Sequence, residues 1–124
     1  MYNYRDAIRK DVVDYVRDHY DAASLKDWSR DALEQELNDA LWIEDSVTGN
    51  ASGSYTCNAD KAREYVTEDR DAENHIRELI AEFGMDAKTI ADHLFDWEYW
   101  DVSIRCYLLG ECISAALDEL EVYD

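Results

Sequence analysis

The sequence predicts a mainly α-helical single domain over residues 1–124. We expect a compact bundle of about five or six helices, with one ordered loop or short β-hairpin at about residues 46–57. Three observations predict this fold. The chain of 124 residues has no proline and only four glycines, so little interrupts a helix. Several segments repeat apolar residues at the spacing of one helix face. Asn, Ser or Asp precedes most of these segments, where a helix cap is expected. The length suits one domain with one core.

The predicted helices lie at about residues 3–19, 29–43, 58–68, 70–83, 86–95 and 101–121. Asn3, Ser29, Asn58 and Asp86 are placed to cap four of them, and Asp69 or Asp71 opens the fourth helix. Gly84 follows the fourth helix, where a left-handed residue often ends a helix. Gly110 lies inside the last helix, where glycine costs roughly 1 kcal/mol relative to alanine. This cost predicts that another helix crosses close to Gly110.

The helical pattern breaks between the second and third helices. Residues 46–56 read SVTGNASGSYT, which is rich in turn-forming residues and contains the β-formers Val47 and Tyr55. An ordered loop and a small hairpin both fit this segment. Its Thr48, Asn50 and Ser52 are of the kind that satisfies backbone groups and holds two helices together.

The net charge of −18 is unevenly distributed. Residues 1–30 are neutral overall, residues 31–60 hold seven acids and no base, and residues 86–124 hold ten acids and two bases. Such a field repels nucleic acid and anionic membranes and attracts basic surfaces. We therefore expect a partner protein with a basic surface, and neither direct nucleic-acid binding nor membrane binding. With no apolar leader and no apolar run of about 20 residues, we expect a cytoplasmic protein.

No catalytic or metal-binding motif is recognisable, so we expect neither an enzyme nor a cofactor. The glycines of residues 49–54 are followed by Ser-Tyr-Thr and lack the lysine that a phosphate-binding loop needs. A calcium loop starting at Asp45 fails because Val47 and Thr56 occupy ligand positions. The three histidines have no zinc-site spacing, and the three cysteines are expected to be free thiols.

Two sets of residues are candidates for binding a partner. Carboxylates at helical spacing can imitate a row of phosphates, since i and i+4 positions stand about 6 Å apart along the axis. The candidate acidic faces are Glu34, Asp39 and Asp45, and Asp92, Asp96 and Asp101. Aromatic side chains are common at interface hot spots, although rings at a helix junction also pack into cores. The loop and aromatic candidates are Trp42, Thr48, Asn50, Tyr55, Trp97, Tyr99 and Trp100.

The stretches LWIEDSVTGNASGSYT (residues 41–56) and DVSIRCYLLGECI (residues 101–113) resemble a family of small acidic proteins of unassigned function. That family occurs in gut bacteria and in their phages and mobile elements, and has LW…DSVTGN.SGSYT and RCYLLG stretches in this order. Cys57 stands where the family pattern leads us to expect an aromatic residue. The resemblance carries no activity. It implies a mobile-element setting, in which small acidic proteins often inhibit restriction or CRISPR nucleases by occupying DNA-binding grooves.

Three hypotheses follow. The first is a non-enzymatic blocker of a DNA-binding protein or nuclease, acting through acidic helix faces and the 46–56 loop as a nucleic-acid mimic. The second is a small accessory or adaptor protein that binds through the aromatic cluster and the same loop. In the third, the charge serves only solubility, as 18 Asp with 4 Lys would on a halophile's surface.

Overall fold

The computed structural model describes residues 3–51, 59–82 and 100–123. These residues form six helices and no strand, which confirms the predicted helical bundle. The predicted hairpin is not confirmed: residues 46–51 form turns, and the rest of that segment lies outside the described ranges. The helices are α1 (Tyr4–His19), α2 (Ala22–Lys26), α3 (Arg30–Leu41), α4 (Ala59–Glu68), α5 (Arg70–Glu82) and α7 (Trp100–Glu119).

Side-chain caps fix the beginnings of three predicted helices. The side-chain oxygens of Asn3 and Ser29 each accept a hydrogen bond from the backbone N–H three residues later, at 3.1 and 3.2 Å. Asp69 accepts the equivalent bond at 3.0 Å, so Asp69 and not Asp71 opens α5. These bonds satisfy amides that have no partner within the helix. The predicted caps Asn58 and Asp86, and the helix expected to follow Asp86, lie outside the described residues.

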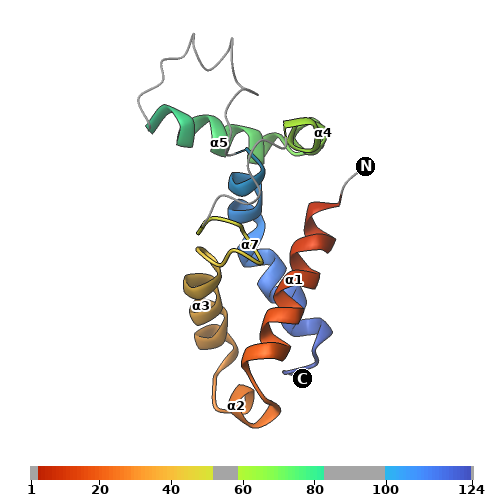
Figure 1. Cartoon of the computed structure of the whole chain (residues 1–124), viewed down its shortest axis with the longest axis vertical. Helices are drawn as coiled ribbons and strands as arrows, with labels where there is room; N and C mark the ends of the chain where they lie inside the picture. The colour runs from red at the N-terminus through yellow and green to blue at the C-terminus, as the bar shows by residue number, and fades with distance from the viewer. Residues whose placement is uncertain (1–2, 52–58, 83–99, 124) are drawn as a thin grey trace.

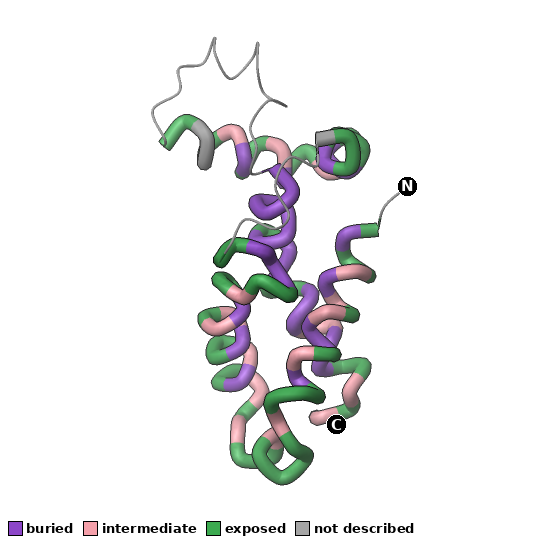
Figure 2. The backbone as a smooth tube through the Cα atoms, viewed as in Figure 1, coloured by how far each residue is buried: buried purple, intermediate pink, exposed green. Residues whose placement is uncertain are grey.

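Helix α7 is the centre of the bundle. It contacts α1, α3, α4 and α5, and α1 and α3 lie on either side of it (Figure 1). Helices α4 and α5 cross near its N-terminal end (Figure 1). A helix that is surrounded in this way must be apolar over most of its circumference. Figure 2 shows the result: α7 is buried along nearly its whole length, whereas α1 and α3 are buried along one side.

The core follows the helical spacing that the sequence predicts. Buried positions on the outer helices recur at intervals of three and four residues, as one helix face requires. The main core residues are Ile8, Val12 and Val16 of α1; Leu33, Leu37 and Leu41 of α3; Ala62 and Val66 of α4; Ala72 and Ile76 of α5; and Ile104, Leu108, Leu109, Ile113, Ala116 and Leu117 of α7.

Gly110 lies where α3 packs against α7. A Cβ atom built on Gly110 would meet the side-chain Nδ2 of Asn38 at 3.6 Å, an ordinary van der Waals distance. The neighbouring helix is therefore close, as predicted, but a methyl group would fit without displacing it.

Among the described helices, we find none with both the length and the apolar character that crossing a lipid bilayer requires.

Candidate functional site

The two stretches that carry the family resemblance meet in space. Arg105, from the RCYLLG stretch on α7, donates a hydrogen bond from Nη1 to the Val47 carbonyl oxygen at 2.9 Å. The Sγ atom of its neighbour Cys106 lies 4.0 Å from the carbonyl oxygen of Trp42. Val47 is fully buried in the core. The segment 42–51, which we call the α3 loop, is therefore fastened to the central helix at two points.

Thr48 organises the α3 loop from within. Its Oγ1 lies 3.2, 3.0 and 3.3 Å from the carbonyl oxygens of Leu41, Trp42 and Glu44, and one hydroxyl proton serves these acceptors. The same oxygen accepts a hydrogen bond from the backbone N–H of Asn50 at 3.2 Å. Thr48 is fully buried, so it is not a partner contact. The sequence also suggested that Thr48 satisfies backbone groups and holds the helix end in place. The hydrogen bonds of its hydroxyl agree with that second interpretation.

The rest of the α3 loop is a series of short turns closed by backbone bonds. The carbonyl oxygen of Glu44 accepts from the N–H groups of Val47, Thr48 and Gly49 at 3.1, 2.9 and 3.2 Å. Gly49 has a φ of 72°, in the left-handed region that glycine enters without a steric penalty. Asn50 is exposed, and its side-chain amide donates to the Trp42 carbonyl oxygen at 3.1 Å. These bonds close the loop onto the end of α3.

A buried group of charges lies behind the α3 loop. The side chain of Arg105 is 3% exposed, with Nη1 3.3 Å from Asp11 Oδ2 on α1 and Nε 3.9 Å from Asp101 Oδ2 one turn earlier on α7. The hydroxyl of Tyr4 donates a hydrogen bond to Asp101. Burial raises the pKa of Asp101, although Tyr4 and Arg105 act in the opposite direction. Burial likewise raises the pKa of Asp11, against the opposing effect of Arg105.

This arrangement corrects two predicted partner contacts. Asp101 is 1% exposed, so it belongs to the interior ion-pair group and not to an acidic outer face. Trp100 is fully buried, and it is one of the largest core side chains. Their positions follow from the central role of α7, whose first turn is covered by α4 and α5. Five further predicted contacts lie outside the described residues: Tyr55, Asp92, Asp96, Trp97 and Tyr99.

The predicted row Glu34, Asp39 and Asp45 does not lie on one face. Five residues correspond to a rotation of about 140° around a helix axis, so Glu34 and Asp39 point to different sides of α3. Glu34 is half-buried beside α7 and pairs with Arg30 at 3.1 Å. Asp39 is exposed and accepts from Gln35 at 3.0 Å, and Asp45 is exposed in the loop. The outer face of α3 instead carries Asp31, Gln35, Asp39 and Trp42 in sequence, all exposed.

Arginines fasten the outer helices to α7 by ion pairs. Arg5 pairs with Glu111 at 3.0 Å and with Asp69 at 3.5 Å. Arg30 pairs with Asp118 at 2.7 Å and donates to Ser114 Oγ at 2.8 Å. These arginines balance acids at the helix contacts, where burial is partial. They leave the acids of the outer face of α3 and of the α3 loop in a segment with no Lys or Arg between residues 31 and 60.

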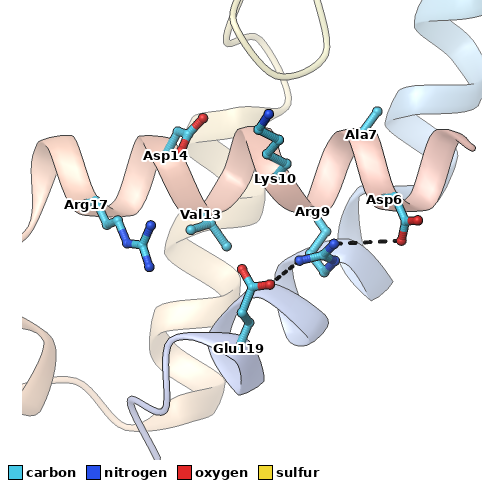
Figure 3. Close-up of a pocket in the computed structure, with 8 residues that line it drawn as sticks. All are labelled: Asp6, Ala7, Arg9, Lys10, Val13, Asp14, Arg17 and Glu119. Carbon is cyan, nitrogen blue, oxygen red and sulfur yellow. Dashed lines mark hydrogen bonds and ion pairs between the residues drawn. The ribbon is translucent and has the colours of Figure 1, made fainter.

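An open groove lies along α1. Its volume is about 490 Å³, and it lies between α1 and the end of α7 (Figure 3). Arg9 stands in it between Asp6 and Glu119 and forms an ion pair with each (Figure 3). Basic and acidic side chains alternate along its walls, so the groove presents no single charge. It is open and lacks a predicted site residue, and we assign it no ligand.

Two adjacent apolar side chains are exposed at the end of α3. The exposed fractions of Trp42 and Ile43 are 45% and 62%. Tyr107 of α7, at 36%, is the third large apolar residue exposed in the described ranges, and its ring stacks on His75 at 5.0 Å. Ile43 is not among the predicted contacts. The sequence offers one indication of its exposure. Ile43 comes two residues after Leu41, the last residue of α3 that points into the core.

The described cysteines are buried free thiols, and the described histidines stack on tyrosine rings. Burial raises the pKa of Cys106 and of Cys112 to about 11, so both thiols are protonated at neutral pH. His19 stacks on Tyr15 and His75 on Tyr107. Within residues 3–51, 59–82 and 100–123, no three potential metal ligands gather at one place.

Comparisons of the chain with protein-family models, with curated proteins and with solved structures give no match.

Proposed function

We propose that this chain is a non-enzymatic, cytoplasmic binding protein that occupies the basic surface of a nucleic-acid-binding protein and so blocks it. The observation that carries the proposal is the segment of seven acids and no base over residues 31–60. Asp31, Asp39, Glu44 and Asp45 of this segment belong to the outer side of α3 and to the α3 loop, on one side of the bundle (Figure 1). Glu34 pairs with Arg30 beside α7, and Asp60 lies on α4. A field of one sign speeds the approach of an oppositely charged surface and excludes like-charged partners.

The acids of α3 favour recognition of a basic surface in general over close imitation of a phosphate row. Asp31 and Asp39 are eight residues apart, or about 12 Å along the helix axis, whereas phosphates recur every 3.4 Å along a strand. The carboxylates are thus too sparse to replace each phosphate. They suit a partner whose Lys and Arg side chains adapt to their spacing. The family resemblance supports a nuclease of the restriction or CRISPR type as that partner.

The adaptor hypothesis loses one of its anchors, because Trp100 is part of the core. The buried, protonated thiols of Cys106 and Cys112 support a non-enzymatic protein. The remaining competitor is the hypothesis that the charge serves only solubility, and it differs in a measurable way. A solubility function requires no retained partner at any salt concentration.

The test is affinity capture at two salt concentrations. The immobilised chain is exposed to nuclease-treated bacterial lysate in about 0.05 M and about 0.5 M salt, since screening lengths differ severalfold between them. We expect basic nucleic-acid-binding proteins to be retained at low salt and released at high salt. Purified captured proteins should then lose DNA binding or cleavage when the chain is added. Retention of no such protein, or capture without any loss of DNA binding, would contradict the proposal.

A charge-matched control separates the acidic surface from net charge. The double variant Asp31→Lys, Asp39→Lys changes the outer face of α3, and Asp14→Lys, Asp18→Lys changes exposed acids of α1 by the same amount. We expect the α3 variant to lose the captured proteins and the α1 variant to keep them. Equal loss in both would assign the effect to total charge alone.

A further inference from the structure

The end of α3 combines exposed apolar area with negative charge. Trp42 and Ile43 are exposed there, as described above, in a part of the chain where polar residues dominate the surface. Asp39 lies three residues before Trp42 and therefore on the same side of the helix. Glu44 and Asp45 follow directly in the loop, and Asp45 is exposed. An apolar centre with a polar rim is the common anatomy of a protein–protein interface.

The charge at this end opposes the intrinsic preference of a helix. The C-terminal end of a helix carries partial negative charge and favours Lys or Arg nearby. The last turn of α3 contains no basic residue, and Glu44 and Asp45 follow it. The bundle uses arginine at its other helix contacts, for example in the pairs Arg5–Glu111 and Arg30–Asp118. The excess of negative charge at this helix end is a cost to folding that a positively charged partner would remove.

The α3 loop presents these side chains on a fixed backbone. The carbonyl oxygen of Trp42 is held by Thr48 Oγ1 at 3.0 Å and by the side-chain amide of Asn50 at 3.1 Å. Arg105 fixes Val47 from behind at 2.9 Å. A surface that is ordered before binding loses less conformational entropy when a partner docks. The hydrogen bonds therefore give Thr48 and Arg105 a part in positioning the surface, although both side chains are buried.

We propose that Trp42 and Ile43 are the apolar anchor of the partner interface, with Asp39, Glu44 and Asp45 as its negative rim. The occupant is a protein segment in which Lys and Arg side chains flank an exposed apolar side chain. Charge complementarity selects this occupant, because a neutral apolar segment would bring no positive charge to Asp39 and Glu44, and a purely basic segment would leave the indole in water. This inference rests on the proposed function and assigns the surface that performs it.

The experiment uses two synthetic peptides of equal length and equal positive charge as probes. In one, lysines and arginines flank two leucines and a phenylalanine; in the other, serines replace these three residues. Binding to the full chain is measured by calorimetry in low salt, and the contact is mapped by amide and indole N–H chemical shifts. We expect the apolar peptide to bind at least tenfold more tightly and to shift the Trp42 indole N–H and the amides of residues 39–51.

Variants of the surface provide the decisive comparison. Trp42→Ala should weaken the apolar peptide at least tenfold, as for an interface hot spot, and leave the serine peptide nearly unchanged. Ile43→Ser is a second variant of the same surface, and its 62% exposed side chain contributes little to folding. Tyr107→Ala is the matched control, because Tyr107 is the other exposed ring of this size in the described ranges. Melting curves confirm that each variant is folded.

The outcomes separate this inference from the proposed function. Equal affinity for the two peptides, with no effect of Trp42→Ala, overturns the anchor but leaves binding by charge intact. Chemical-shift changes confined to another face, or equal losses in Trp42→Ala and Tyr107→Ala, overturn it as well. If neither peptide binds at low salt, both the anchor and the attraction to basic segments on which the proposed function depends are refuted.

Discussion

Replacing Arg105 with methionine tests the buried charge group that holds the α3 loop to α7. Methionine keeps a long, flexible apolar stem but removes the guanidinium. The change deprives Asp101 of an ion-pair partner at 3.9 Å. It also removes the hydrogen-bond donor of Asp11 at 3.3 Å and of the Val47 carbonyl oxygen at 2.9 Å. We expect a large loss of stability at neutral pH and a smaller loss in mild acid.

The magnitude follows from the exposure of the groups left behind. Removing one partner of a buried ion pair costs about 3–5 kcal/mol, because the other charge stays buried. Asp101, whose side chain is 2% exposed, accounts for most of this cost, although Tyr4 still donates to it. Asp11 is 30% exposed and can be hydrated, so its share is discounted. The lost bond to Val47 adds about 1 kcal/mol. We expect a total of about 3–5 kcal/mol at pH 7.5, out of a typical 5–15 kcal/mol.

The pH dependence has a definite sign. Burial already raises the pKa of Asp101 and of Asp11 in the folded state, and Arg105 opposes this in both. Without Arg105 both pKa values rise further. Between the unfolded value and the raised folded value, the folded state binds more protons than the unfolded state. The variant is therefore stabilised as pH falls through that window and destabilised as pH rises through it.

The assay is urea unfolding followed by circular dichroism at about pH 7.5 and about pH 5, for the native chain, Arg105→Met and Arg105→Lys. The lysine variant keeps the positive charge and should lose less stability than the methionine variant. A loss by Arg105→Met that is the same at both pH values would refute the assignment of the cost to the two carboxylates. A loss below about 1 kcal/mol would refute the structural role of the guanidinium itself.

Three further predictions concern the loop, a helix crossing and the net charge. Thr48→Val should lower the free energy of unfolding in urea by about 1 kcal/mol, because each carbonyl oxygen near Thr48 keeps another donor. A loss of more than about 3 kcal/mol would mean that these acceptors are left unsatisfied. Gly110→Ala should stabilise the chain by up to about 1 kcal/mol, since the new methyl meets Asn38 at 3.6 Å; destabilisation in the same assay would indicate a tighter crossing. Raising the salt concentration from about 0.01 to about 0.5 M should raise the melting temperature by several degrees, because salt screens the repulsion of a net −18 charge. A lower melting temperature in high salt would show that the ion pairs outweigh that repulsion.

The helices were predictable because their signals are local. Caps at Asn3 and Ser29 and the spacing of apolar residues are set by the helix itself, and they mark the beginnings and inner faces of α1 and α3. Helix α2 has no such signal: it is five residues long, and none of its residues is buried. Its cap, Asp21, accepts a hydrogen bond from Ser24 N–H at 2.7 Å, but the segment is too short to show a periodic pattern.

The site was less predictable because it depends on partners distant in sequence. A helical aspartate is most often exposed, and the burial of Asp101 depends on Tyr4, 97 residues away. A partial signal exists: Asp101 and Arg105 stand four residues apart, and Arg105 is a lone base among apolar residues of the last helix. The role of Thr48 was equally hard to predict. The three carbonyl oxygens around its hydroxyl come together only when the end of α3 and the loop fold.

The position of α7 in the chain has a consequence for biosynthesis. The apolar faces of α1 and α3 are covered mainly by this helix, which is the last of the described helices to be translated. Until residues 100–119 leave the ribosome, the earlier segments have no surface on which to bury those faces. Contacts between segments this far apart also slow folding, because a long loop must close before they form. We therefore expect the nascent chain to complete its core only after α7 has emerged, in a single late step, with its acidic residues limiting aggregation until then.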